Sequence, residues 1–239
     1  MNWQITCGNL KQLPASLKVW EPWTVVISKC VRQKTTLLTV IIIRAGTVPF
    51  FWLAVVDQTY KFLYTNVGSP GRNHDAAVFR RSRLPAVLAS DVFKAETKIF
   101  GGVSVGPVLL ADQAFPLQCN LMKPFPHPDP AASPSQAFNY CLSSARRVVE
   151  NAFGRLKARF RILHKGVECG IAYVNCVVRA CCVLHNICEQ LSDRCNVSWL
   201  EIVSRDDKKR PQPVCITSHQ YQPTGVAVRK ALAEYLAAN

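Results

Sequence analysis

Two acidic residues stand where a metal-dependent active site could use them. Asp112 follows an apolar run, Gly102 to Ala111, that is typical of a buried strand, and Glu150 lies in a basic helical segment. Sheets of α/β proteins expose functional groups at their strand ends. A carboxylate there and another on a facing helix could share two divalent metals, which would activate water for phosphodiester cleavage. Carboxylate oxygens suit Mg²⁺ or Mn²⁺. The simpler alternatives are a loop-start aspartate and an ion pair of Glu150 with Arg146 or Arg147.

Positive charge surrounds Glu150 along the chain. Between Cys141 and Lys165 there are seven Lys and Arg residues and a single acid. Solvated charged faces are common, but this excess around one glutamate favours a groove that follows a phosphate backbone. The candidate phosphate contacts are Arg146, Arg147, Arg155, Lys157, Arg159 and Arg161.

The segments that would position these residues predict a mixed α/β domain. Residues 51–68 contain two apolar strands around a polar turn at Asp57, which indicates a hairpin. Asp75 precedes an apolar helical segment and could cap its first turn. Apolar residues at helical spacing from Val149 to Leu163 predict one helix, and the segment 171–191 predicts a second that is apolar almost all round and therefore buried. After residue 192 the chain turns polar until a short C-terminal helix.

Composition sets the class of protein. The 239 residues are 49% hydrophobic and 18% charged, which allows a packed core, and the net charge of +14 favours polyanionic partners. An odd number of cysteines without a signal peptide indicates reduced thiols in the nucleus or cytoplasm. The apolar run Leu37 to Val56 is long enough to span a membrane, but Arg44 near its middle would cost about 2.5–3.5 kcal/mol. We therefore expect no membrane partner.

Four ordered motifs resemble the transposases of Harbinger/PIF DNA transposons and the nucleases derived from them. They are VGSPGRNHDAAVFRRS, LLADQAFPL, AFNYCLSSARRVVENAFGRLKARFRIL and CCVLHNIC, which lie between residues 67 and 188. The resemblance implies an RNase H-like mixed sheet flanked by helices, with an Asp-Asp-Glu site that binds Mg²⁺ or Mn²⁺ and cleaves DNA. Asp112 matches the second aspartate, Glu150 matches the glutamate, and Asp75 matches a His-Asp motif near the metal. The resemblance also implies a nuclear protein that leaves specific DNA recognition to a separate partner protein.

The expected organisation is an atypical segment at 1–48, a nuclease domain at 49–191 and a polar tail at 192–239. The family's first catalytic aspartate belongs to a Gly-x-x-Asp-Gly-x-His strand upstream of the hairpin, but no aspartate precedes Asp57 here. One hypothesis is that residues 20–51 are translated out of frame. If the codons from Trp20 onward are read two bases out of frame, the genetic code permits the sequence Gly-x-x-Asp-Gly-x-His. The same shift from Ile41 onward permits a Tyr-Lys-Gly sequence like the one in the family.

The missing aspartate predicts a disrupted N-terminal strand and little or no nuclease activity in the chain as written. The alternative function is that of an inactive relic that binds DNA or a protein partner through its basic surface.

Cysteine and histidine also share one face of the second predicted helix. Cys181, His185 and Cys188 lie at i, i+4 and i+7. A zinc site would need a fourth ligand, and cysteine is among the most frequently buried residue types. We expect these residues to pack in the core.

Overall fold

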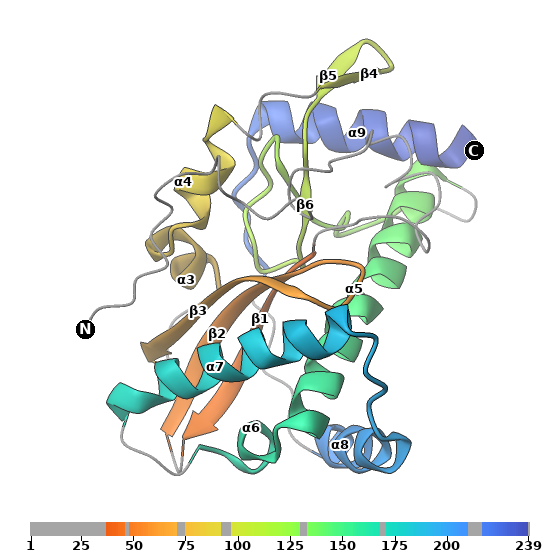
Figure 1. Cartoon of the computed structure of the whole chain (residues 1–239). Coiled ribbons are helices and arrows are strands. Elements are labelled where there is room, and N and C mark those ends of the chain that lie inside the picture. Colours follow the sequence, from red (N-terminus) through yellow and green to blue (C-terminus); the bar gives the residue numbers. More distant parts are fainter. Residues whose placement is uncertain are drawn as a thin grey trace.

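The centre of the molecule is a five-stranded sheet with the strand order β3-β2-β1-β6-β7 (Figure 1). Its strands are β1 (Leu37–Ala45), β2 (Val48–Val56), β3 (Phe62–Pro70), β6 (Leu109–Leu110) and β7 (Leu121–Met122). The first three strands form an antiparallel meander, whereas β6 and β7 run parallel to β1. The computed structural model describes residues 37–45, 48–70, 75–91, 97–129, 133–167, 171–209 and 217–238.

The predicted hairpin is confirmed, and Asp57 forms its turn. The Asp57 Oδ1 atom accepts hydrogen bonds from the backbone N–H groups of Thr59, at 2.8 Å, and Lys61, at 3.0 Å. Tyr60 completes the turn with a positive φ of 65°. An aspartate that hydrogen-bonds the backbone two residues on is a frequent turn former. Its carboxylate is therefore engaged in local structure.

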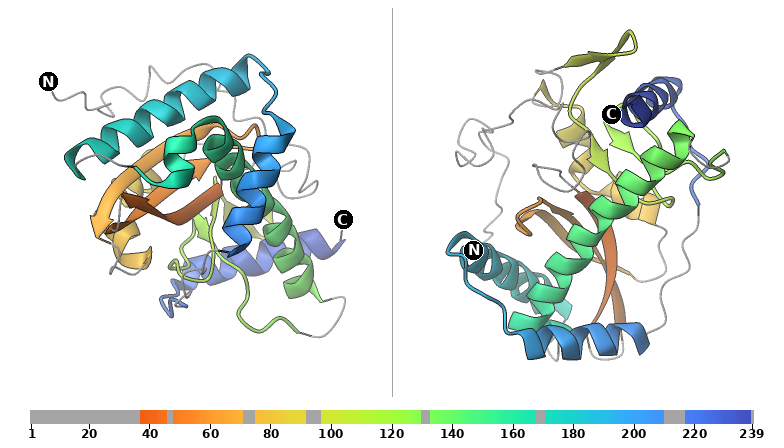
Figure 2. Two further views of the ribbon diagram at one scale, coloured as in Figure 1. Left: turned by 90° about the horizontal axis from the view of Figure 1, so that it is seen from below. Right: turned by 90° about the vertical axis from the view of Figure 1, so that its right-hand side faces the viewer.

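Alternating residues of β2 send side chains to opposite faces of the sheet, as the period of a strand requires. Trp52, Ala54 and Val56 pack against helices α5 (Pro134–Arg159) and α7 (Ile171–Gln190). Leu53 and Val55 pack on the other face with α3 (Asp75–Arg81) and α4 (Leu84–Leu88). The sheet is thus covered on both faces (Figure 2), and the predicted mixed α/β class is confirmed.

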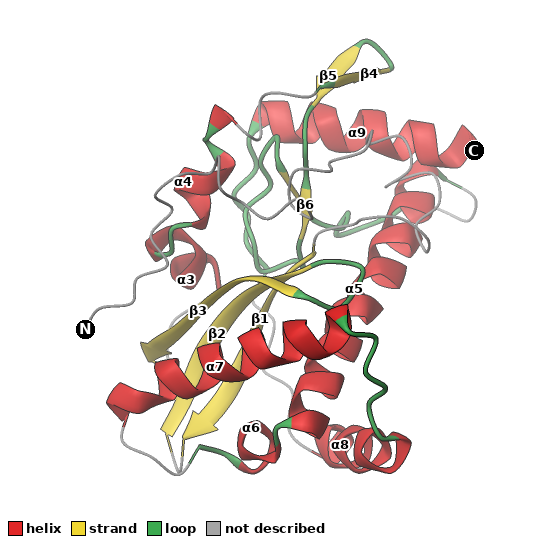
Figure 3. Cartoon of the chain, viewed as in Figure 1, coloured by secondary structure: helices red, strands yellow, loops and turns green. Residues whose placement is uncertain are grey.

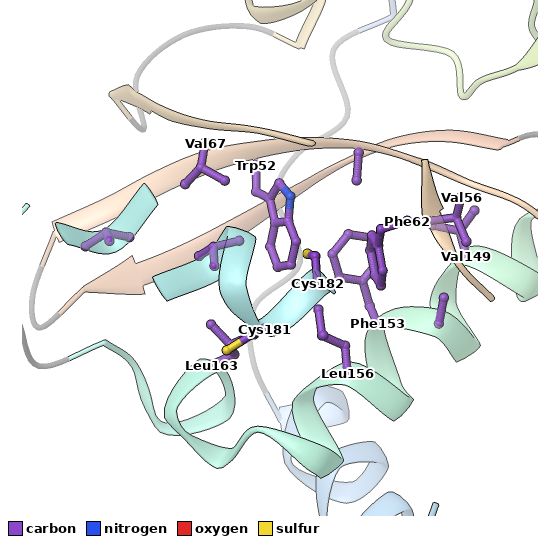
Figure 4. Packing of buried hydrophobic residues seen from close by; sticks show 14 of the residues in the cluster. Trp52, Val56, Phe62, Val67, Val149, Phe153, Leu156, Leu163, Cys181 and Cys182 are labelled. Atoms are coloured by element: carbon purple, nitrogen blue, oxygen red, sulfur yellow. The ribbon is translucent and has the colours of Figure 1, made fainter. Parts of the chain in front are cut away.

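Aromatic rings fill the core between the sheet and α5. The ring of Phe153 meets Trp52 edge-on with a centroid separation of 4.8 Å and meets Phe62 edge-on at 5.1 Å (Figure 4). Edge-to-face pairs of this kind stabilise a core beyond the area that they bury. They fix α5 on the strands that precede it by about a hundred residues in the chain.

A second core joins the N-terminal half of α5 to the C-terminal helix α9 (Pro223–Ala238). It also holds the small hairpin of β4 (Lys98–Phe100) and β5 (Val103–Val105). Helix α9 approaches the backbone closely at Gly225, where an added Cβ would lie 2.7 Å from the carbonyl carbon of Gln118. The C-terminal helix is therefore an integral part of the packed structure.

Several local predictions differ from the structure. The expected strand over 102–111 is split into β5 and β6, because Pro107 has no N–H to donate and interrupts the pairing. The expected helix over 149–163 ends at Arg159, and the short helix α6 (Arg161–Lys165) follows it. The polar segment after residue 192 contains the helix α8 (Val197–Lys209), visible at the lower right of Figure 3.

The prediction that the 171–191 helix is buried all round is wrong. Only one face of α7 packs against β3 and α5, and Tyr173 and Leu184 on its other face are 67% and 50% exposed. The membrane-like run is the β1–β2 pair, and none of the described helices is long and apolar enough to cross a bilayer. Residues 20–36 of the suspected out-of-frame segment lie outside the described residues, whereas 37–45 form the central strand.

Candidate active site

Asp112 lies at the end of β6, as the sequence predicts. The Ala111 N–H donates to the Met122 carbonyl at 2.8 Å, so β6 remains paired with β7 up to this point. The Asp112 Oδ1 atom accepts the Ala114 N–H at 2.9 Å. Burial raises the pKa of Asp112 above its usual value, against the opposing effect of this hydrogen bond and of the charges on Arg146 and Lys123. The carboxylate is therefore half-buried beside cationic side chains.

Glu150 lies on the helix that crosses this strand end. Helix α5 packs against β1, β2 and β6. Arg146, whose charge acts on Asp112, is four residues before Glu150, so the two share one face of the helix. Both side chains are exposed. The structure thus brings Asp112 and the Glu150 face of α5 to the same region.

The third carboxylate of the predicted site has no counterpart on β1. This strand is the neighbour of β6 and runs parallel to it, with Leu37 paired to Leu110. Strand β6 ends at Leu110, and continuing the same register for two more residues would place Thr39 opposite Asp112. The strand sequence, Leu-Leu-Thr-Val-Ile-Ile-Ile-Arg-Ala, contains no acid at all. The central strand therefore completes the sheet but contributes no metal ligand.

The donor set does not fit a two-metal centre. Asp75 is the first residue of α3, and its side chain lies outside the described residues. Across the parts of the chain that the structure describes, no three His, Cys, Asp or Glu side chains are grouped closely enough to hold a metal ion. The Asp112 Oδ1 atom already accepts a backbone N–H, and among the side chains that the structure describes the Glu150 face of α5 offers the second carboxylate.

The predicted phosphate-contacting residues fall into two sets. Arg146, Arg147 and Arg161 are exposed and remain candidates for binding a polyanion. Lys157 forms an ion pair with Asp207 of α8, with 2.7 Å between Nζ and Oδ2. Arg155 and Arg159 are bound to Glu189 of α7. The second set is engaged inside the protein, because each of its members already has an anionic partner.

Glu189 is the centre of a buried ionic cluster that sequence reasoning missed. Arg155 donates to both carboxylate oxygens at 2.7 Å, and Arg159, itself 6% exposed, donates to Oε1. Burial alone would raise the pKa of Glu189, but the hydrogen bonds from the two arginines outweigh it and lower that pKa. The partners are 30 and 34 residues apart in sequence, so no local spacing predicts the cluster.

The His-Asn pair of the CCVLHNIC motif closes the edge of the sheet. Asn186 accepts the Phe62 N–H at 2.8 Å and donates to the Phe62 carbonyl at 2.9 Å, which completes the backbone pairing of β3. His185 is fully buried, and its Nε2–H donates to the Tyr60 carbonyl at 3.0 Å while Nδ1 accepts from Arg159. Burial lowers the pKa of His185 to about 4. The neutral imidazole is therefore part of the core.

Comparison with known proteins assigns a family. The DDE superfamily endonuclease profile matches residues 50–186, which is more than half of the chain. The mouse (Mus musculus) protein "Putative nuclease HARBI1" is 32% identical over 139 residues, which cover 56% of this chain and 36% of that protein. The Xenopus laevis protein of the same name is 28% identical over 187 residues, 75% of this chain and 48% of that protein.

A plant protein gives a similar match. The Arabidopsis thaliana "Protein ALP1-like" is 26% identical over 149 residues, 59% of this chain and 35% of that protein. The chain thus spans less than half the length of these curated relatives, and no solved structure matches it significantly. The family match covers Asp112 and Glu150, and the similarity to a Harbinger-derived protein agrees with the motifs in the sequence. This chain belongs to the DDE superfamily endonucleases.

Proposed function

We propose that this chain, as its sequence stands, is an RNase H-like member of its family that binds DNA through an exposed basic face and does not cleave it. The observation that carries the proposal is the sequence of β1, the strand paired with β6: extending the observed register by two residues would place Thr39, and no acid, opposite Asp112. The neighbouring strand is where a second carboxylate could meet Asp112 most directly, and it holds none.

The strand order supports the fold assignment. Three antiparallel strands are followed by two that run parallel to the first, which gives the order 3-2-1-4-5 when the strands of the main sheet are counted along the chain. Helices cover both faces of this sheet. A mixed sheet covered by helices supports the RNase H-like fold that the resemblance to Harbinger-type nucleases implies.

DNA binding rests on charge that the protein does not use internally. Arg146, Arg147 and Arg161 are exposed along α5 and α6, and the whole chain carries +14. Cations that neutralise phosphates release counterions, so affinity falls with salt by about 0.9 in log–log slope for each phosphate contact. Sequence specificity would then require a separate DNA-binding partner, and the protein would act in the nucleus.

The test combines a binding assay with a cleavage assay. Fluorescence anisotropy measures the affinity for a DNA duplex of random sequence at several salt concentrations. The logarithm of the binding constant should fall linearly with the logarithm of the salt concentration. Arg147→Gln combined with Arg161→Gln should reduce its slope by up to about 1.8. Lys157→Met is the matched control, because that ammonium already binds Asp207 in a partly exposed ion pair and its loss should leave the slope unchanged.

Plasmid nicking with Mg²⁺ or Mn²⁺ tests the second half of the proposal. We expect binding without nicking. The second candidate function is the intact reaction of the family, metal-dependent phosphodiester hydrolysis with Asp112 and Glu150 as ligands. The observation that favours it is that α5 brings the Glu150 face to the end of β6. Nicking that requires Mn²⁺ and is abolished by Asp112→Ala would establish this candidate and reject ours.

A further inference from the structure

Helix α8 carries aspartates and cations on different faces. Val203 is 4% exposed and faces the protein, and Asp206 and Asp207 follow it at i+3 and i+4, so they lie on the same side of the helix. Asp206 Oδ2 lies 3.0 Å from His164 Nε2 of α6, and Asp207 Oδ2 lies 2.7 Å from Lys157 Nζ of α5. Both aspartates are therefore engaged by the protein itself.

The cations of α8 lie on its outer side. Arg205, Lys208 and Lys209 occupy positions i, i+3 and i+4, and all three are exposed. They line one open hollow of about 560 Å³ along the helix. Arg205 lies 3.7 Å from Asp206, whereas neither lysine forms an ion pair with an acid in the part of the chain that the structure describes. The C-terminal end of α8 thus presents positive charge that the protein leaves unpaired.

The contacts that hold α8 also place it beside the exposed cations of α6. His164, which meets Asp206, lies in sequence between Arg161 and Lys165, and both of these are exposed. In Figure 1 the two helices lie at the C-terminal end of α5. Arg161 belongs to the basic face that we propose for DNA binding. Helix α8 therefore continues this face beyond α6.

A phosphate backbone is the partner that suits this surface. Five exposed cations are spread over α6 and α8, which matches an extended polyanion. Each phosphate that they neutralise releases counterions whatever the base sequence is. Glu201, an acid on the outer side of α8, stands at the end away from the two lysines. The family profile ends at residue 186, so the family match assigns no role to α8.

We propose that α8 extends the DNA-binding surface, with Lys208 and Lys209 contacting phosphates next to those that Arg161 holds. This role rests on the DNA binding proposed above. The duplex then lies along the exposed cations of α5 and α6 and reaches α8 at its C-terminal end. Helix α5 from Arg147 to Arg159 alone spans about 18 Å, so the two ends of the surface contact well-separated phosphates.

The salt dependence of duplex affinity, measured by fluorescence anisotropy with the full chain, tests the proposal. Lys208→Gln combined with Lys209→Gln should reduce the log–log slope by up to about 1.8, because each phosphate contact contributes about 0.9. The matched control is Lys98→Gln combined with Lys230→Gln. It removes the same charge from β4 and α9, which pack together near the other end of α5, and should leave the slope unchanged. Circular dichroism verifies that every variant is folded.

The variants separate this role of α8 from DNA binding itself. If the α8 variant keeps the wild-type slope while Arg147→Gln with Arg161→Gln reduces it, α8 does not contact DNA and the proposed function stands. An equal loss of slope in the control would also overturn the role of α8, because net charge alone would then explain it. A wild-type chain without measurable affinity for DNA would reject both proposals.

Acetylation of lysines, read by mass spectrometry, tests the contact in the wild-type chain. A bound duplex should protect Lys208 and Lys209 from modification and leave Lys230, whose side chain is 76% exposed, as reactive as before. Equal modification of all three lysines with and without DNA would overturn the proposal. Protection of Lys208 and Lys209 by vesicles of anionic phospholipid, but not by DNA, would overturn it in favour of a membrane surface.

Discussion

Replacement of Glu189 by alanine should destabilise the protein strongly although the residue touches no candidate catalytic group. Glu189 and Arg159 are each 6% exposed, and Arg155 is 26% exposed. Removing one partner of a buried ion pair leaves an uncompensated charge and costs about 3–5 kcal/mol. We expect the lower part of that range, about 3 kcal/mol, because Arg155 can turn to solvent and Arg159 keeps its contact with the Asp193 carbonyl at 2.6 Å.

Thermal and urea unfolding followed by circular dichroism measure this loss. For a chain of this size a loss of about 3 kcal/mol lowers the Tm by roughly 6–12 °C. Glu150→Ala is the matched control, since that carboxylate is exposed and its removal should change stability by less than about 0.5 kcal/mol. If the free energies of unfolding of the two variants differ by less than 1 kcal/mol (about 2–4 °C in Tm), the ionic cluster does not stabilise the packing of α7 on α5. The structural role that we assign to Arg155 and Arg159 would then be wrong.

The other predictions concern acid stability, packing and the metal site. The buried neutral His185 has a pKa lowered from 6.5 to about 4, so the unfolded chain binds this proton first and stability should fall as the pH drops from 6.5 to about 4. His185→Gln should flatten this part of a pH series of urea midpoints, and an unchanged slope would show that other groups cause it. Gly225→Ala should lower the free energy of unfolding by about 1–3 kcal/mol, because the added methyl group would contact the backbone of Gln118. Gly154→Ala should leave the free energy of unfolding unchanged or raise it, because no atom lies within 4 Å of the added methyl group. Equal changes in the two variants would contradict the close approach of α9 to Gln118. Thr39→Asp should create measurable Mn²⁺ binding, by electron paramagnetic resonance, that Asp112→Ala removes, and no binding would refute the alignment of β1 with β6.

Features that depend on neighbouring residues were predictable from the sequence. The β2–β3 hairpin follows from two apolar strands around Asp57, and the structure uses that aspartate in the turn. The start of α3 at Asp75 and the position of Asp112 at a strand end also follow from local pattern. Each of these signals lies within a few residues of the feature that it predicts.

Features that depend on distant partners were not predictable in the same way. An apolar helix does not reveal how many of its faces will be covered, and α7 is covered on one. The basic run around Glu150 does not reveal that Glu189 and Asp207 neutralise three of its members. Helix α8 is likewise positioned by pairs such as His164 with Asp206, at 3.0 Å between Nε2 and Oδ2, which only the tertiary fold brings together.

Stability and catalysis depend on different properties of β1 in this fold. The strand pairs with β2 over its whole length, from Leu37 opposite Val56 to Ala45 opposite Val48, and an apolar sequence rich in β-branched residues suits that position. Metal chemistry would need only one carboxylate at the level of Asp112. A change in the amino-acid sequence of the central strand can therefore leave the sheet and the basic face of α5 intact. Such a change would remove cleavage without removing DNA binding. This separation is why we propose DNA binding for the chain as it stands, and why a single substitution at Thr39 is the sharpest probe of the activity that its family fold could support.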